Sequence, residues 1–328
     1  NKFTDYNGGQ QGLILNNSAQ ALAPTQLGGF ITGNPNLAGG AAGLILNEVT
    51  GSNASRLEGY TEVAGQAAHV IVANPHGITC DGCGFINTPK ATLTTGTPQI
   101  DNGALKGYDV NGGSIAIEGA GLNAGNVGQF ELITRAAEIN AEIHAQQLTI
   151  VTGRNEVDAQ TLAATAKADD GSAKPSVAID SSALGGMYAG AIRLVGTEAG
   201  VGVKLAGDLA ASGGDIRIDA NGQLTMARSA AAGDLAIKAQ DVTLQNDTFA
   251  AGSASIETNQ LDVQESLAAG NRVEVTAQTL NNPGTIEAGV HADGSLNASA
   301  QLQLSGDAVT NSGKLISHGS LSTEIGRA

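Results

Sequence analysis

The sequence predicts an all-β protein, a right-handed single-stranded parallel β-helix (a solenoid), and two observations support that prediction. The first is a spacing of 19 residues that recurs in the C-terminal third of the chain. The second is the composition, because the chain has 46 glycines, no tryptophan and only 3% aromatic residues. Small aliphatic side chains suit a narrow core of stacked layers better than a globular core. Right-handed coiling is expected because parallel crossovers nearly always take that hand.

Three columns of residues keep the 19-residue spacing in one register. Two columns are apolar and alternate with polar neighbours, which is the period of a β-strand. The third column is glycine or asparagine just before each strand, which predicts corners with positive φ. A unit this short cannot close its own core, so successive units must stack strand on strand. The columns are Ile216, Leu235, Ala254 and Val273; Ile218, Ile237, Ile256 and Val275; and Gly214, Gly233, Gly252 and Asn271.

The N-terminal part of the chain keeps the strand pattern but loses the regular spacing, which predicts extra-helical β elements inserted between coils. The candidate insertions are residues 94–113 and 163–175. Two apolar pentamers, residues 12–16 and 43–47, are expected to form an N-terminal cap, because an open helix end exposes unpaired strand edges.

These patterns divide the chain into two expected segments. Residues 1–205 are expected to hold the cap and the irregular coils, and residues 206–328 the regular 19-residue repeats of the same β-helix. Each segment is long enough to bury a core of its own.

The charge of the chain argues against several classes of partner. With 16 Lys and Arg against 31 Asp and Glu, the net charge of -15 repels phosphate backbones and anionic lipid, so no nucleic-acid partner is expected. Charged residues make up only 14% of the chain, which is low for a cytoplasmic protein and fits an extracellular surface. No apolar run approaches the roughly 18 residues that a membrane span needs. No signal peptide precedes Asn1, so either a leader was removed or the chain is cytosolic.

Two Asn-Pro turns stand in the first quarter of the chain. In each turn the proline presets φ for the second position, and the leading asparagine can cap the turn through its side chain. Taken alone, each motif predicts a turn. The two motifs consist of Asn34, Pro35, Asn36 and Leu37, and of Asn74, Pro75, His76, Gly77 and Ile78.

The two turns, followed by the segment from Cys80 to Cys83, resemble the haemagglutination-activity domain, or TPS domain, of two-partner secretion exoproteins. Filamentous haemagglutinin and the contact-dependent growth inhibition (CdiA-type) proteins carry this domain. The resemblance covers nearly the whole chain, including the opening Asn1-Lys2-Phe3 and the 19-residue units. It departs from the family at His76, where the NPNG pattern has asparagine. The cysteine pair resembles the haemolysin and growth-inhibition branches more than filamentous haemagglutinin, so we expect the growth-inhibition type or a large adhesin.

The resemblance implies export through the periplasm and the outer membrane, with the chain then secreted or attached to the cell surface. The expected partner is a TpsB-family outer-membrane β-barrel transporter, whose periplasmic POTRA domains receive the chain. The resemblance also implies folding outside the cell, a monomer without a cofactor, and a downstream part of the polypeptide that contacts a target-cell receptor. The two turns are candidate motifs for transporter recognition or for folding, and the folding interpretation is favoured because turn chemistry already explains the residues.

Cys80 and Cys83 are the two cysteines of the chain, and their C-x-x-C spacing admits three interpretations. A short-range disulfide is favoured because an exported protein meets an oxidising compartment. A thioredoxin-like redox pair needs a helix start, which Gly82 disfavours. A zinc site could recruit His69 and His76, but a second cysteine pair is absent from the sequence. We therefore predict a disulfide and no metal.

Two other functions fit a β-helix. Polysaccharide lyases and hydrolases of this fold use clustered carboxylates, whereas the acidic residues here are scattered along the sequence. An adhesin or glycan-binding module would use an extended face of the solenoid. The histidines form no recognisable catalytic constellation, so each is expected at the surface or in a turn, and we predict no catalytic residue and no enzyme. The histidines are His69, His76, His144, His291 and His318.

Overall fold

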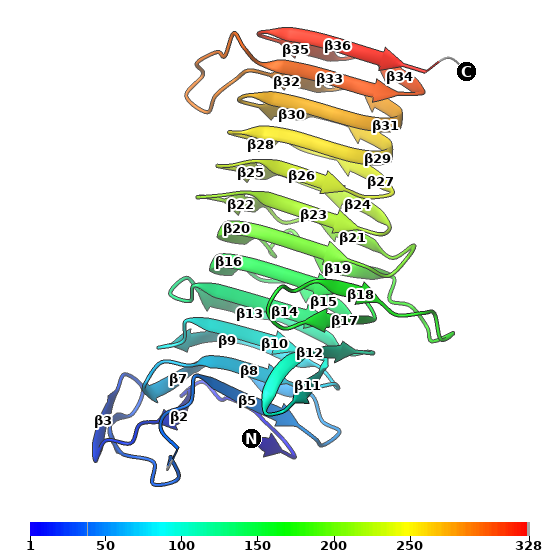
Figure 1. Cartoon of the computed structure of the whole chain (residues 1–328). Helices are drawn as coiled ribbons and strands as arrows, with labels where there is room; N and C mark the ends of the chain where they lie inside the picture. The colour runs from blue at the N-terminus through cyan, green and yellow to red at the C-terminus, as the bar shows by residue number, and fades with distance from the viewer. Residues whose placement is uncertain (38, 327–328) are drawn as a thin grey trace. The chain divides into compact units, whose positions relative to one another are not determined.

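The computed structural model describes residues 1–37 and 39–326, and every regular element among them is a β-strand (Figure 1). The chain forms two compact units, Asn1–Ala173 and Lys174–Ala328. Within each unit most strands pair in parallel with the equivalent strand of the next coil, which confirms the predicted parallel β-helix. The predicted boundary between residues 205 and 206 marks the start of regular spacing and stays a prediction.

Membrane-spanning helices were also sought in the structure. The described residues form no helix that is long and apolar enough to cross a bilayer.

The first unit winds its coils through short parallel strands whose inward side chains stack in columns. In one column Val70 faces Ala91, Ala91 faces Phe130, and Phe130 faces Leu148. All four side chains are buried, so this column is part of the core. The coil strands are β1 (Lys2–Phe3), β2 (Leu13–Asn17), β5 (Leu44–Val49), β6 (Ser55–Leu57), β7 (Tyr60–Gly65), β8 (His69–Ala73), β9 (Ile78–Ile86), β10 (Lys90–Thr94), β13 (Ser114–Ala124), β14 (Gln129–Thr134), β15 (Ala136–Ile139) and β16 (Ile143–Thr152).

The two apolar pentamers form strands of the first coils, and their role as an N-terminal cap stays a prediction. They lie in β2 and β5, which pair in parallel with β7 and β8 as ordinary coil strands; Leu15 faces Val63, and Leu46 faces Ile71. None of their leucine and isoleucine side chains is fully buried; five are half-buried and Leu44 is 39% exposed.

Six strands of the first unit stand outside the coils, as the sequence predicted for part of them. The insertion at 94–113 supplies two strands of a four-stranded antiparallel sheet, and the insertion at 163–175 contains another. A separate two-stranded hairpin between β2 and β5 was not predicted (Figure 1). The extra-helical strands are β3 (Leu22–Thr25), β4 (Gly29–Thr32), β11 (Thr97–Asp101), β12 (Ala104–Val110), β17 (Asn155–Asp158) and β18 (Ala164–Ala166).

The second unit confirms the 19-residue register. Ile216 faces Leu235, and Ile237 faces Ile256, as the aligned columns predicted. The strands are β19 (Val177–Ser181), β20 (Met187–Gly196), β21 (Gly202–Leu205), β22 (Leu209–Ala211), β23 (Ile216–Ala220), β24 (Gln223–Met226), β25 (Ser229–Ala231), β26 (Leu235–Lys238), β27 (Asp241–Leu244), β28 (Thr248–Ala250), β29 (Ser253–Val263), β30 (Ser266–Ala269), β31 (Arg272–Asn282), β32 (Thr285–Ala288), β33 (Gln301–Gly306), β34 (Ala308–Asn311), β35 (Lys314–Ser317) and β36 (Ser320–Ile325).

Glycine recurs at the corners for a steric reason, and not because the corners need positive φ as the sequence predicts. Gly214, Gly233 and Gly252 do not adopt positive φ. A Cβ atom on Gly233 would instead collide with the carboxylate of Asp215 and press on the backbone of Gly214. At Gly233 and Gly252 the corners of successive coils therefore approach too closely for a side chain, whereas Asn271 stands at the equivalent position one coil later.

An aspartate ladder, formed by Asp215 and Asp234, ties these corners together. Asp215 Oδ1 accepts a hydrogen bond from the backbone N–H of Asp234 at 2.9 Å, and Asp234 Oδ1 accepts one from Ser253 N–H at 2.8 Å. The bond from the Asp234 N–H and the neighbouring Arg217 hold the pKa of Asp215 below its usual value. Each carboxylate thus fixes the position of the coil that follows it.

The register is interrupted once more near the C-terminal end. Arg272 faces Gln301, and Gln301 then faces Ser320, which restores the spacing of 19. Residues 289–300 leave the wall between β32 and β33 as a loop. The extra residues are thereby removed from the stack without changing the strand register.

Candidate functional site

The first Asn-Pro turn fastens the segment after the β3–β4 hairpin to strand β2. Asn34 Oδ1 accepts a hydrogen bond from the backbone N–H of Asn36, and Asn34 Nδ2 donates one to Asn16 O, both at 3.0 Å. The Asn34 N–H also donates to Ser18 O at 2.7 Å. Pro35 and Asn36 are exposed, and Leu37 is half-buried.

The second Asn-Pro turn connects β8 to β9 and is built in the same way. Asn74 is fully buried, and its Oδ1 accepts a hydrogen bond from the backbone N–H of His76 at 2.9 Å. Its Nδ2 donates to Asn53 O and to Ser55 Oγ, each at 2.9 Å. One amide side chain therefore shapes its own turn and links it to the corner of the preceding coil.

The remaining residues of this turn have backbone roles. Gly77 adopts a φ of 114°, which favours glycine, and its N–H donates to Asn74 O at 3.1 Å. Ile78 is buried at the start of β9, whereas Pro75 and His76 are exposed. The exposed position explains why histidine is accommodated where the family pattern has asparagine.

The two turns use separate partner segments, so the structure does not bring them together into one hydrogen-bonded site. In both turns the asparagine side chain is occupied by internal hydrogen bonds. This arrangement supports a role in folding. Direct recognition through these side chains stays a proposal.

Cys80 and Cys83 form a disulfide within β9 in the structure, and both residues are buried. The bridge spans a tight bend in which Gly82 has a φ of 79°. Cys80 faces Leu57 in the preceding coil and Ile117 in the following one. The disulfide therefore packs between two coils at a corner of the helix.

An arginine in β6, beside this bend, contacts an acidic residue just after its own strand and one in each of β9 and β13. Arg56 contacts Glu58 at 2.5 Å, Asp81 at 2.9 Å and Glu118 at 2.9 Å. Arg56 is exposed and its three partners are half-exposed, so water screens each pair and it contributes little to stability on its own. Their common effect is to neutralise acidic side chains that the stack places near one another.

A half-buried polar cluster lies on strands β8, β10 and β14. Glu131 is buried, contacts Lys90 at 2.6 Å, and accepts a hydrogen bond from Thr92 Oγ1 at 2.7 Å. His69 Nε2 is 2.9 Å from the same hydroxyl, which has donated its proton to Glu131. His69 therefore donates from Nε2–H as a neutral ring. The sequence predicts His69 at the surface or in a turn; this prediction is wrong because His69 begins strand β8 and is half-buried against Thr92.

His69 predicts that acid weakens this unit. Burial, and then the charge of Lys90, lower the pKa of His69 from 6.5 to about 4. Below pH 6.5 the unfolded chain binds a proton that the folded chain does not bind until about pH 4. The free energy of unfolding is therefore expected to fall by about 3 kcal/mol through His69 alone as the pH drops from 6.5 to 4.

The measurement is denaturant unfolding of the wild type and of His69→Gln at several pH values across that window. Glutamine retains an N–H donor toward Thr92 but does not titrate. The free energy of unfolding of the wild type should fall relative to that of His69→Gln as the pH drops from 6.5 to 4. The exposed His76→Gln is the matched control, and an equal pH effect of that change would contradict the assignment to His69.

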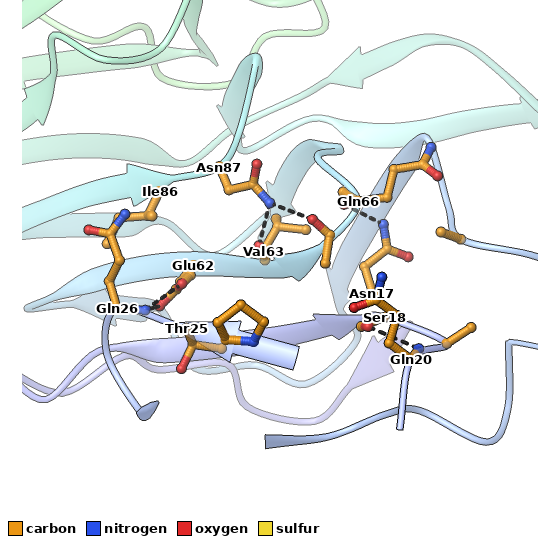
Figure 2. Close-up of a pocket in the computed structure, with 14 residues that line it drawn as sticks. Asn17, Ser18, Gln20, Thr25, Gln26, Glu62, Val63, Gln66, Ile86 and Asn87 are labelled. Atoms are coloured by element: carbon orange, nitrogen blue, oxygen red, sulfur yellow. Dashed lines mark hydrogen bonds between the residues drawn. The ribbon is translucent and has the colours of Figure 1, made fainter. Parts of the chain in front are cut away.

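A cleft of about 780 Å³ opens between the β3–β4 hairpin and the first coils (Figure 2). On one side the buried carboxylate of Glu62 accepts hydrogen bonds from the backbone N–H groups of Gln26 and Leu27, at 2.7 to 2.9 Å. On the other side Asn17 Nδ2 donates to Ala42 O and Gln66 O. These contacts clasp the hairpin and the following loop onto the coils.

Sequence reasoning missed Glu62 and Asn17. The partners of Glu62 lie about 36 residues away in the sequence, so no local sequence pattern predicts the contact. A weak signal existed for each residue: Glu62 is a charge inside a strand that is otherwise buried, and Asn17 ends an apolar pentamer strand.

Metal ligands were also sought. Within residues 1–37 and 39–326, no group of three or more His, Cys, Asp or Glu side chains is arranged to hold a metal ion.

Comparison with known proteins gives consistent matches. The family model of the TPS secretion domain matches residues 1–226. The tRNA nuclease CdiA of Escherichia coli strain NC101 is 56% identical over 233 residues, which are 70% of this chain and 7% of that protein. The tRNA nuclease CdiA-2 of Burkholderia pseudomallei strain 1026b is 51% identical over 324 residues, 97% of this chain and 10% of that protein. The chain thus spans no more than about a tenth of these relatives.

A solved structure adds a likeness in fold. The crystal structure of the filamentous hemagglutinin secretion domain superposes with a TM-score of 0.64 at 31% sequence identity. The match covers 84% of this chain and 88% of that domain.

Proposed function

This chain belongs to the family of TPS secretion domains, and from that membership we propose that it directs the export of a longer polypeptide through a TpsB-type outer-membrane β-barrel. The periplasmic POTRA domains of the barrel bind the first unit before its coils have stacked. The polypeptide crosses the periplasm and the outer membrane, folds outside, and is then secreted or held at the cell surface as a monomer.

The observation that carries this proposal is that relatives named for different activities are all similar to this chain. A tRNA nuclease and a 16S rRNA endonuclease are 56% and 54% identical to this chain over segments of 233 residues. A segment shared by proteins with different targets serves a step that they have in common, and export is such a step. We propose the same division here, with any toxic activity and a target-cell receptor contact residing downstream.

The stacking of coils supplies a driving force for this export. Each new coil of the second unit buries apolar side chains such as Ile237, Leu244 and Ala250. Fully burying one leucine or isoleucine is worth about 1.5–3 kcal/mol. Side-chain links such as Lys238 to Glu257 join residues 19 apart, so they form only when the next coil arrives. A coil that has stacked outside the cell therefore opposes sliding back.

The two Asn-Pro turns are proposed to act in folding rather than as the contact surface. Their asparagine side chains are already occupied within the domain, which supports this assignment. Loss of secretion on mutation would fit both roles, so binding to isolated POTRA domains is the informative measurement.

The test of the proposed function is secretion of this chain, fused to a secretion leader, from cells with and without the cognate barrel. We expect release only when the barrel is present, and accumulation in the periplasm when it is absent. Release that does not depend on the barrel, or retention in both strains, would falsify the proposal.

A further inference from the structure

A long uncharged segment stands out in an otherwise acidic chain. Residues 6–47 contain no Asp, Glu, Lys, Arg or His, although the whole chain has a net charge of -15. The β3–β4 hairpin lies inside this segment. Any partner that meets the hairpin therefore encounters side chains without charge, and it must bind through apolar contacts and uncharged polar groups.

The outer face of the hairpin is apolar and exposed. In the antiparallel register Leu22 faces Thr32, and Pro24 faces Phe30, so these four side chains share one face. Leu22 is 60% exposed and Phe30 is 74% exposed. Large apolar side chains left together on a surface mark an interaction site more often than chance placement does.

The inner face of the hairpin makes the contacts that hold it to the domain. Ala23 is fully buried, and Ile31 beside it is half-buried. Glu62 clasps the turn, and Asn16 Nδ2 donates to Thr32 O at 2.8 Å. The outer side chains take no part in these contacts, so they are not needed to fix the hairpin on the coils.

The hairpin is also local in sequence. Its strands form a two-stranded sheet of their own, and within the described residues neither strand pairs with a coil. All of its strand partners lie within residues 22–32, so the hairpin can form before any coil has stacked. The buried side chain of Asn74, in contrast, needs Asn53 and Ser55 from the preceding coil.

We propose that the outer face of the β3–β4 hairpin, made by Leu22, Pro24 and Phe30, is the surface that the periplasmic domains of the transporter bind. This inference rests on the proposed function. An isolated hairpin is only marginally stable, so an apolar groove that covers this face, with a strand added to the free hairpin edge, would stabilise it on binding.

The transporter fits this surface better than two other occupants. It meets the chain before the coils stack, when local hairpins such as β3–β4 can already be formed. A second copy of the chain brings another net charge of -15, which opposes close approach. The three apolar side chains carry about as much hydrocarbon as a single myristoyl chain, which by itself gives only marginal membrane binding.

The test uses the full chain with a secretion leader and the double change Leu22→Ser with Phe30→Ser. The matched control is Ile100→Ser with Leu184→Ser, which removes two other exposed apolar side chains, 57% and 77% exposed. Barrel-dependent secretion is measured first. Binding of the chain to the purified periplasmic part of the transporter is then measured immediately after dilution from denaturant, together with thermal unfolding of the refolded proteins.

We expect the hairpin variant to bind the periplasmic domains at least tenfold more weakly and to accumulate in the periplasm, with an unchanged melting temperature. The control should match the wild type in all three measurements. Wild-type binding by the hairpin variant would overturn the inference, as would an equal loss in the control. Barrel-independent secretion of the wild type would instead remove the proposed function itself.

Discussion

Replacing Asn74 with alanine is expected to lower the free energy of unfolding by about 2–4 kcal/mol. The change removes the acceptor for the N–H of His76 and the donors to Asn53 O and Ser55 Oγ. Ser55 is itself buried, so its hydroxyl would lose a partner where water cannot easily replace it. The loss therefore includes unsatisfied polar groups as well as the hydrogen bonds.

Denaturant unfolding of purified protein measures this effect, and His76→Asn is the matched control. His76 is exposed and gives the turn only its backbone N–H, so this change should alter stability by less than about 0.5 kcal/mol. Binding of the freshly diluted Asn74→Ala chain to the POTRA domains should stay at the wild-type level. Weaker binding at unchanged stability would show that the turn is read directly and would refute its folding role.

The change Ala236→Pro is expected to lower the free energy of unfolding by about 3 kcal/mol or more. It should also block folding of the exported chain beyond β26. Ala236 lies between Arg217 and Ser255 in consecutive coils, so its backbone belongs to a ladder that is paired on both sides. Proline removes the N–H from this ladder and restricts Leu235 before it. Coils after this point then lack a regular edge on which to stack.

The measurement is the rate of secretion together with protease resistance of the exported chain. Ala236→Ser is the matched control because the side chain at this position is exposed. If stacking drives export, the proline variant should be secreted several-fold more slowly and be cut by protease downstream of β26, while the serine variant behaves as wild type. Secretion of the proline variant at the normal rate would separate export from coil stacking.

The regular part of the fold was predictable because its information is periodic and local. The column that contains Ile237 and Ile256 predicts both the strand and the strand that pairs with it one coil later. The structure pairs these two residues in that register. The insertion at 94–113 was predictable as a gap in this pattern. The corner glycines were found correctly, but their cause was not, since close approach between coils leaves no trace in one unit.

Less of the candidate site could be predicted. The turns were found from the chemistry of Asn34 and Asn74, but the coil contacts that occupy these side chains depend on tertiary structure. Glu62 and the hairpin turn that it holds are separated by about 36 residues and have no repeating pattern. His69 was misplaced because a single histidine at the start of an apolar strand does not reveal which neighbours will surround it.

The aspartate ladder between corners has a consequence for the evolution of this protein. The carboxylate of Asp215 accepts a hydrogen bond from the backbone N–H of Asp234, and the carboxylate of Asp234 accepts one from Ser253. The units that begin at Asp215 and Asp234 are therefore each linked to the next unit by the same contact. Duplication or loss of one such unit would leave the contacts at its two ends chemically unchanged. An insertion of any other length has to leave the wall as a loop, as residues 289–300 do. Duplication of such a unit would therefore lengthen the stack of coils without creating a new kind of interface.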